Sequence, residues 1–294
     1  MNQFSPIIFG AWRLADTASE ANSASVARKV TAALEFGINT FDHADIYGDY
    51  SCEELFGAAI TKSKIPRDKY KIITKCGIKL VSQQRPEHGL KTYDTGARHI
   101  NASVERSLKN LNTDHIDLLL IHRPDPLLNP DEVADTFNRL KQQGKVLNFG
   151  VSNFSTQQVR MLQSRLDAPL IANQIEFSLL NTDPLYNGQL DQCLEMRMTP
   201  MAWSPLAGGR IFSAHDDRTQ PIRVCLNQLS EKYNIKSPET LAYAWLLKHP
   251  ANVKPVVGTG KPERLKSAMD ALSLKLDHED WFQLLKAAVG TDVP

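Results

Sequence analysis

Residues 116–152 read IDLLLIHRPDPLLNPDEVADTFNRLKQQGKVLNFGVS, and this stretch decides the fold. It holds two short apolar runs, IDLLLIH and VLNFGVS, with a helical pattern at 131–143 between them. Proline and acidic residues at 129–132 (NPDE) favour a helix start, and Gly144 stands where the helix should end. A run that is continuous in Leu and Ile, like the first, is typical of a parallel strand buried on both faces. The stretch therefore predicts a strand–helix–strand unit.

The same alternation of apolar runs and helical patterns continues along the rest of the chain. Further strands are expected in IIFG from Ile7, INTFDH from Ile38, YKIITKC from Tyr70, LIANQ from Leu170, MTPMAWS from Met198 and VKPVVGT from Val253. Helical patterns occupy residues 25–36, 97–111, 156–165 and 222–233. The chain therefore offers eight strands, and helical patterns recur between them.

This order predicts an α/β fold, a (β/α)₈ TIM barrel that forms a single domain over residues 1–294. An open doubly wound sheet is the alternative, but it would usually carry G-x-G-x-x-G after its first strand, where this chain has FGAW. Two intervals, 77–95 after the third strand and 204–221 after the seventh, are long enough to be active-site lids. Residues 277–288 should form one more helix outside the repeat.

The composition indicates an ordinary globular protein. Of its 294 residues 42% are hydrophobic and 23% are charged, and the formal net charge is +1, so neither nucleic acid nor a membrane surface is expected as a partner. The longest apolar run, 241–247, is far too short to span a membrane. The N-terminus does not resemble a secretory signal, and the sequence contains four widely spaced cysteines, Cys52, Cys76, Cys193 and Cys225. Reduced thiols and a cytoplasmic location are therefore expected.

Polar residues recur where the predicted strands end. Each has an ordinary structural explanation: a loop cap for Asp42, an ion pair for Lys75, a hydrogen-bonded core histidine for His122, and packing for Tyr47 five residues beyond Asp42. The carboxyl ends of barrel strands meet around one pocket, however, so side chains at equivalent ends should converge there. Further members of this set are Ser152, Asn153, Asn173, Gln174, Trp203 and Ser204.

The types of these residues suit the reduction of a carbonyl group. Hydride addition leaves an alkoxide that must take up a proton, and a tyrosine with its usual pKa near 10 is a weak donor. An ammonium about 4 Å away is worth at most about 4 kcal/mol at an effective dielectric near 20. We therefore expect Lys75, held by Asp42, to lower the pKa of Tyr47, the proton donor. His122 would orient the carbonyl oxygen.

At this point the motifs together resemble a known family. FDHADIYG, IITKCG, DLLLIHRP, GVSNF, NQIEFS, MAWSPLAGG and PVVGTGKPER occur in the order and spacing of the aldo-keto reductase superfamily, over nearly the whole chain. The most specific element is the family's Asp–Tyr–Lys–His tetrad, which maps onto Asp42, Tyr47, Lys75 and His122. The resemblance implies an oxidoreductase that reduces aldehydes or ketones to alcohols.

The resemblance also implies NADPH (NADP⁺ when oxidised) as cofactor, extended across the top of the barrel. Ser152, Asn153 and Gln174 would hold the carboxamide of the nicotinamide, and Trp203 would stack on its ring. Ser204, Leu206 and Gly208 would line the path of the pyrophosphate. Gly258, Thr259, Lys261 and Arg264 would surround the 2′-phosphate, where backbone amides near a helix start and an arginine suit a phosphate. Without that role, Lys261 and Arg264 are solvated surface charges.

The small-molecule carbonyl substrate is expected to lie between five side chains: Trp12, Arg13, Ile78, Arg123 and Phe154. Arg123 replaces the tryptophan that follows the catalytic histidine in many relatives, which should make the pocket more polar. Arg123 could instead only pair with Asp45 or Asp125.

Two other kinds of function compete with the reductase. A metal-dependent barrel hydrolase could use Asp42, His43, Asp45 and His122 as ligands. However, strand alternation turns His43 away from Asp42, and Lys75 would repel a cation. A regulatory protein that binds the cofactor as a sensor is the second alternative, although the complete tetrad favours retained chemistry.

Overall fold

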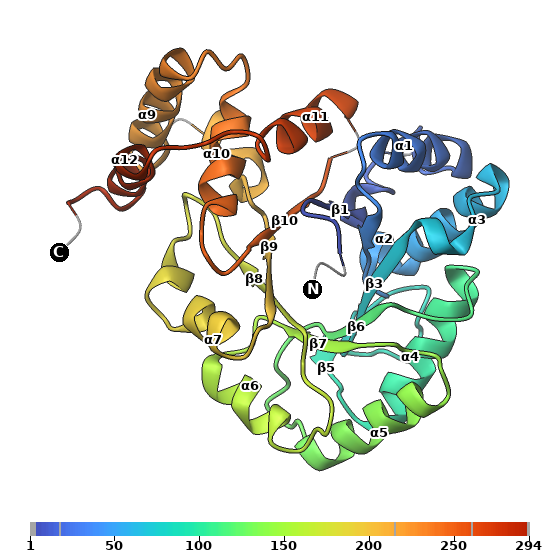
Figure 1. The fold of residues 1–294 in the computed structure, drawn as a ribbon. Coiled ribbons are helices and arrows are strands. Elements are labelled where there is room, and N and C mark those ends of the chain that lie inside the picture. Colours follow the sequence, from blue (N-terminus) through green and yellow to red (C-terminus); the bar gives the residue numbers. More distant parts are fainter. Residues whose placement is uncertain (1–3, 18, 215, 260, 293–294) are drawn as a thin grey trace.

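Eight parallel strands close into a barrel (Figure 1). The computed structural model describes residues 4–17, 19–214, 216–259 and 261–292. Around the barrel the strands follow the order β1-β10-β9-β8-β7-β6-β3-β2, so the first strand pairs with the last. The predicted TIM barrel is therefore confirmed. Its strands are β1 (Ile8–Gly10), β2 (Thr40–Asp42), β3 (Lys71–Cys76), β6 (Leu118–Ile121), β7 (Phe149–Ser152), β8 (Ala172–Glu176), β9 (Thr199–Trp203) and β10 (Lys254–Val257).

Helices form a ring outside the strands (Figure 1). Among the described residues, no helix is long and apolar enough to cross a membrane. The α-helices are α1 (Ser23–Glu35), α2 (Tyr47–Tyr50), α3 (Cys52–Ser63), α4 (Ala97–Asn110), α5 (Pro130–Gln142), α6 (Thr156–Gln163), α7 (Gln189–Glu195), α8 (Arg210–Ser213), α9 (Thr219–Lys232), α10 (Pro238–Leu247), α11 (Pro262–Asp270) and α12 (His278–Val289). Short 3₁₀ turns are η1 (Ala11–Arg13), η2 (Arg67–Lys69), η3 (Asp183–Leu185) and η4 (Ala207–Gly209).

The unit at 116–152 forms as its sequence predicts. The Asn129 side chain accepts hydrogen bonds from the backbone N–H groups of Asp131 and Glu132, and Pro130 occupies the first turn of α5. Gly144 follows the end of α5 with φ = 71°, a left-handed conformation that glycine adopts without strain. The chain thereby turns back into β7, which pairs with β6.

The inside of the barrel is filled with side chains and is not a channel. Every second side chain of a strand points inward, and these side chains pack as one fully or nearly fully buried cluster. The cluster includes Ile8, Ile73, Leu118, Leu120, Met201 and Val256. The side chains that point outward from the strands are buried against the surrounding helices. The packed interior gives a rigid floor to anything that binds at the strand ends.

Both long intervals carry structure of their own. Residues 77–95 contain β4 (Ile78–Lys79) and β5 (Thr92–Tyr93), which pair antiparallel as a hairpin. The interval after β9 contains η4 and α8. The extra C-terminal helix is confirmed as α12, which packs on α9 on the outer side of α10 (Figure 1).

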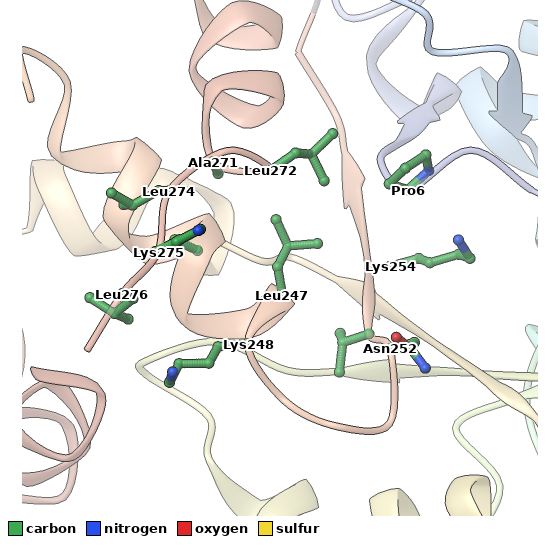
Figure 2. A pocket seen from close by; sticks show the side chains of 12 residues that line it. Pro6, Leu247, Lys248, Asn252, Lys254, Ala271, Leu272, Leu274, Lys275 and Leu276 are labelled. Carbon is green, nitrogen blue, oxygen red and sulfur yellow. The ribbon is translucent and has the colours of Figure 1, made fainter. Parts of the chain in front are cut away.

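A hollow of about 400 Å³ opens at the end of the barrel where the strands begin, beside the start of β10 (Figure 2). It is lined by leucines, among them Leu247 and Leu274, and by Lys248, Lys254 and Lys275. The buried Lys254 ammonium donates to the carbonyl oxygens of Phe4 and Ser5, at 3.1 and 3.3 Å. None of the predicted site residues lines this hollow, because all of them follow the other ends of the strands.

All four cysteines are free and buried. Burial raises the pKa of the Cys52 thiol to about 11, that of Cys193 to about 12 and that of Cys225 to about 11. Thiols with such pKa values stay protonated at neutral pH and are poor nucleophiles. Their role is packing, as expected for Cys76, which lies in the core between the sheet and α4.

Candidate active site

A buried ammonium lies at the centre of the predicted tetrad. The Lys75 Nζ atom is 2.8 Å from each carboxylate oxygen of Asp42, 2.8 Å from the carbonyl oxygen of His43 and 3.0 Å from the Tyr47 hydroxyl. Lys75 is fully buried and Asp42 is 2% exposed. Neighbouring strands bring the pair together, because β2 and β3 are hydrogen-bonded and both side chains point into the barrel top. The sequence-predicted contact between Asp42, Lys75 and Tyr47 is thus present.

Burial and the neighbouring charges shift the pKa values of Lys75 and Tyr47 in opposite directions. Burial alone would lower the pKa of Lys75, but the Asp42 carboxylate and Tyr47 outweigh it and leave that pKa above its usual value. Lys75 is therefore a permanent cation. Burial raises the pKa of Tyr47, and the attraction of Lys75 offsets only part of this rise. The expected net lowering of the Tyr47 pKa is thus wrong, because desolvation exceeds the Coulomb effect.

His122 follows β6 and faces Tyr47 across the cavity. The two rings meet edge to face, with centroids 5.9 Å apart and an interplanar angle of 79°. Burial, followed by the charges of Lys75 and Arg123, holds the pKa of His122 well below its usual value. The imidazole is therefore neutral at physiological pH, and its buried Nδ1 has no hydrogen-bond partner within the described part of the chain.

Residues of β7, β8 and β9, together with Asn153 directly after β7, form a chain of hydrogen bonds. Trp203 Nε1 donates to Asn153 Oδ1 at 2.9 Å, Asn153 Nδ2 donates to Ser152 Oγ at 2.8 Å, and Ser152 Oγ donates to the Gln174 carbonyl at 3.0 Å. Gln174 Nε2 donates to Asp42 Oδ1 at 2.8 Å. Gln174 thus contacts the tetrad directly, and this chain links Ser152, Asn153 and Trp203 to it.

The predicted phosphate path is rich in unusual backbone conformations. Ser204, Ala207, Gly208 and Gly209 all have positive φ values in the loop after β9. A Cβ atom built on Gly208, Gly209 or Gly258 would meet nothing within 4 Å, so these backbones border open space. The loop therefore leaves room for a ligand to approach the main chain closely.

Arg264 and Lys261, both predicted to bind the 2′-phosphate, lie at different places. Arg264 lines the cavity, with its Nε 3.7 Å from Glu239 Oε1. Lys261 caps the start of α11, is exposed and does not line the cavity.

One cavity of about 1180 Å³ joins these groups. It runs from Asp42, Tyr47 and His122 past Ser152, Asn153, Gln174 and Trp203 to Ser204, Leu206, Gly208, Gly258, Thr259 and Arg264. The sequence reasoning missed several lining residues: Asp16, Asp49, Lys91, Tyr93, Glu239 and Tyr243. Lys91 and Tyr93 carried a signal, since they lie in the long interval after the third strand. Glu239 and Tyr243 carried none, since α10 reads as an ordinary buried helix.

Four of the five predicted substrate residues line the cavity: Trp12, Arg13, Ile78 and Arg123. Phe154 does not, and the structure corrects that expectation. Its side chain is fully buried in the core between the sheet and the helices, where it packs with Val159 and Leu162. The residue follows Asn153, whose left-handed backbone (φ = 61°) turns the chain away from the pocket.

Arg123 stacks on an aromatic ring. Its guanidinium lies 5.6 Å from the centroid of the Trp203 ring. The Asp125 carboxylate accepts hydrogen bonds from Thr95 and from the backbone N–H of Leu127 instead. Among the described residues, no carboxylate forms an ion pair with Arg123, so neither suggested partner holds it.

His43 and Asp45 point away from the tetrad. The His43 ring is fully buried edge-on against Phe56, at 4.5 Å between centroids. Within the described ranges, no three His, Cys, Asp or Glu side chains lie close enough to hold a metal ion.

Comparison with known proteins extends this picture. The fold and the position of the cavity define a (β/α)₈-barrel enzyme whose site lies at the carboxyl ends of the strands. The sequence model of the Aldo/keto reductase family matches residues 6–288, and the chain belongs to that family. The oxidoreductase YcsN of Bacillus subtilis is 47% identical over 99% of this chain and 97% of its own. A protein of Agrobacterium fabrum named 6-dehydroglucose reductase is 43% identical over 99% and 96%.

The fold is also shared with solved structures. An aldo-keto reductase from Klebsiella pneumoniae, crystallised with NADPH, superposes with a TM-score of 0.78 and 25% identity, over 96% of this chain and 90% of its own. The predicted class of enzyme, an aldo-keto reductase that uses NADP(H), is confirmed by membership of this family.

Proposed function

We propose that this protein reduces the carbonyl group of a small, hydroxylated compound with NADPH, and that Tyr47 donates the proton. The observation that carries the proposal is the hydrogen bond of 3.0 Å between Tyr47 and the buried Lys75 ammonium at the floor of the cavity. A phenol beside a permanent cation is a proton donor whose conjugate base is stabilised where it forms.

The cavity fits a dinucleotide cofactor. It extends from the tetrad to the start of α11, and the glycines at 208, 209 and 258 leave open space beside the main chain. Trp203 would lie against the nicotinamide, the residues from Ser204 to Gly208 beside the pyrophosphate, and Arg264 near the 2′-phosphate. When bound, the cofactor supplies the hydride.

Side chains of the protein then supply the proton and stabilise the tyrosinate that remains. Tyr47 stays a neutral phenol at physiological pH, because burial raises its pKa, and can donate to the carbonyl oxygen as negative charge develops there. The tyrosinate that remains is stabilised by Lys75, whose charge is fixed by the Asp42 carboxylate. The neutral His122 lies opposite and can donate a second hydrogen bond to the same oxygen.

The cavity wall favours a polar substrate. Arg13, Lys91 and Arg123 bring cations to it, Asp16 and Asp49 bring carboxylates, and Trp12 is 57% exposed at its edge. A wall of this kind can satisfy several hydroxyl groups, and a sugar-sized molecule can also lie flat on an indole. Similarity to a 6-dehydroglucose reductase, over almost the full length of both chains, supports the same substrate class.

The test is the variant Tyr47→Phe, assayed for NADPH oxidation with glyceraldehyde and, for comparison, with propanal. Wild type should prefer the hydroxylated aldehyde by at least about tenfold in kcat/KM, because polar groups left unpaired by propanal are costly. The variant should lose about 10²–10⁴-fold in kcat, the usual contribution of a general acid. Its affinity for NADPH, followed by tryptophan fluorescence, should not change.

Tyr186→Phe is the matched control. Tyr186 is 62% exposed and does not line the cavity, so loss of its hydroxyl should leave kcat and KM unchanged. Full activity of Tyr47→Phe would refute the proposed role of Tyr47. A preference for propanal would refute the substrate class alone.

A further inference from the structure

The chain turns in an unusual way directly after Tyr47. Gly48 (φ = 59°, ψ = 38°), Asp49 (φ = 52°, ψ = 52°) and Tyr50 (φ = 68°) are three consecutive residues in the left-handed region. Glycine adopts this conformation freely, aspartate tolerates it, and a bulky aromatic residue does so rarely. Such a turn persists only where surrounding contacts determine it.

Tyr50 supplies those contacts from behind the cavity wall. Tyr50 is 8% exposed and does not line the cavity. Its hydroxyl accepts a hydrogen bond of 2.9 Å from the backbone N–H of Leu80, and the Arg85 guanidinium lies 4.5 Å from its ring centroid. His88 meets the ring edge to face at 6.3 Å, and its Nδ1 is 3.1 Å from the Leu80 carbonyl oxygen.

These contacts join two parts of the cavity wall. The hairpin segment, residues 78–93, lines the cavity with Ile78, Leu80, Lys91 and Tyr93. On the other side of Tyr50, the turn lines the same cavity with Tyr47, Gly48 and Asp49. Movement of the hairpin segment would therefore be transmitted through Tyr50 to the proton donor.

We propose that Tyr50 is a positioning residue, which couples the hairpin segment to Tyr47 through the bond from Leu80 N–H to the Tyr50 hydroxyl. The inference rests on the proposed reduction with Tyr47 as donor. Tyr50 touches neither substrate nor cofactor; it sets the distance between the wall that holds the substrate and the hydroxyl that protonates it.

The variant Tyr50→Phe tests this coupling, because it removes the hydroxyl and keeps the ring. Loss of the hydrogen bond to the partly buried Leu80 N–H should lower kcat/KM for the carbonyl compound by about 5- to 30-fold. Both a higher KM and a lower kcat should contribute. The affinity for NADPH should stay within about twofold of wild type, since the predicted cofactor residues lie between β7 and α11, away from the hairpin segment. Tyr186→Phe again serves as the control.

Two further measurements separate coupling from general damage. Amide exchange of residues 78–93 should become faster in Tyr50→Phe, while exchange in α5 should not change. In the Tyr47→Phe background, adding Tyr50→Phe should leave the residual kcat unchanged, because the donor through which Tyr50 acts is missing.

Wild-type kinetics of Tyr50→Phe, or wild-type exchange of the hairpin segment in that variant, would overturn the inference. An equal loss of kcat with and without the Tyr47 hydroxyl would also overturn it. If the wild-type protein reduced no carbonyl compound while it still bound NADPH, the proposed function would fail. Unchanged exchange at Leu80 would remain a separate refutation of the coupling.

Discussion

His43 shows at the scale of one residue how position overrides chemical type. It neighbours Asp42, yet its ring faces Phe56 and neither ring nitrogen has a hydrogen-bond partner among the described residues. Burial, followed by the charge of Lys75, lowers the pKa of His43 to about 3. Its role is structural, and it stays neutral in the folded protein.

The pH dependence of stability should carry a contribution from His43. A histidine whose folded pKa is lowered binds its proton in the unfolded chain first, so stability is lost as pH falls below about 6.5. The slope is up to about 1.4 kcal/mol per pH unit down to the folded pKa. His43→Leu should remove this dependence, measured by urea unfolding at pH 7.5, 6 and 5.

The comparison must be made between the variant and wild type at each pH. Asp45 contributes in the opposite direction, because burial and then Glu53 raise its pKa to about 7, so its contribution falls as pH rises from about 4 to 7. The difference curve between His43→Leu and wild type cancels Asp45. A difference that does not change with pH would contradict the assignment.

The tetrad is the part of the site that the sequence predicts best. Asp42, Lys75 and His122 each follow an apolar run, and strand pairing alone brings them together. The protonation behaviour of Tyr47 was beyond the sequence, since desolvation depends on residues of several elements that surround it. Phe154 was misplaced for a related reason, because the backbone of Asn153 decides its direction.

At the scale of elements, α3 depends on a close crossing with the end of α4. A Cβ atom on Gly57 would lie 2.1 Å from the carbonyl oxygen of Asn110 and 2.9 Å from the carbonyl carbon of Leu111. Gly57 lies inside α3, and a glycine within a helix weakens the helical signal of the sequence. The same residue, Gly57, allows α3 to pack closely against the end of α4.

Gly57→Ala should therefore destabilise the protein. Alanine would stabilise an isolated helix by about 1 kcal/mol, but the clash with backbone atoms should outweigh this and cost about 1–3 kcal/mol overall. Gly89→Ala is the control, because a Cβ there meets nothing within 4 Å. Thermal or urea unfolding measures both, and a Gly57→Ala variant as stable as wild type would contradict the crossing.

The other elements follow their patterns to differing degrees. All eight expected strands form, since their apolar runs are buried on both faces. The β4–β5 hairpin was expected only as a long interval, because two-residue strands with an exposed face leave no periodic signal. Strand and helix ends shifted by a few residues, as hydrogen bonding rather than composition fixes them.

At the scale of the whole molecule, the cavity draws on nearly every strand end. Tyr47 follows β2, whereas Arg264 belongs to α11 at the far end of the chain, so binding and chemistry should be separable. Arg264→Gln should weaken NADPH binding by about 10- to 100-fold, the loss of a charged hydrogen bond. Its kcat at saturating NADPH should not change.

NADH, which lacks the 2′-phosphate, provides the internal comparison for Arg264→Gln. Its affinity should be the same for the variant and for wild type. Arg160→Gln, in an exposed pair with Glu195 on the outer helices, is the matched control for loss of an arginine. Equal weakening of NADH and NADPH by Arg264→Gln would show that the residue does not contact the phosphate.

The pairing of β1 with β10 has a consequence for the synthesis of the protein on the ribosome. Ile8 lies opposite Val256 and Phe9 opposite Val257, so nearly the whole chain separates the two partners. A ribosome releases the N-terminal strand first and needs on the order of tens of seconds to deliver its last neighbour. One edge of β1 stays unpaired until β10 has been synthesised, and only then can the barrel close. During that interval the unpaired edge of β1 must be protected from pairing with other chains, and this need follows from the closed barrel.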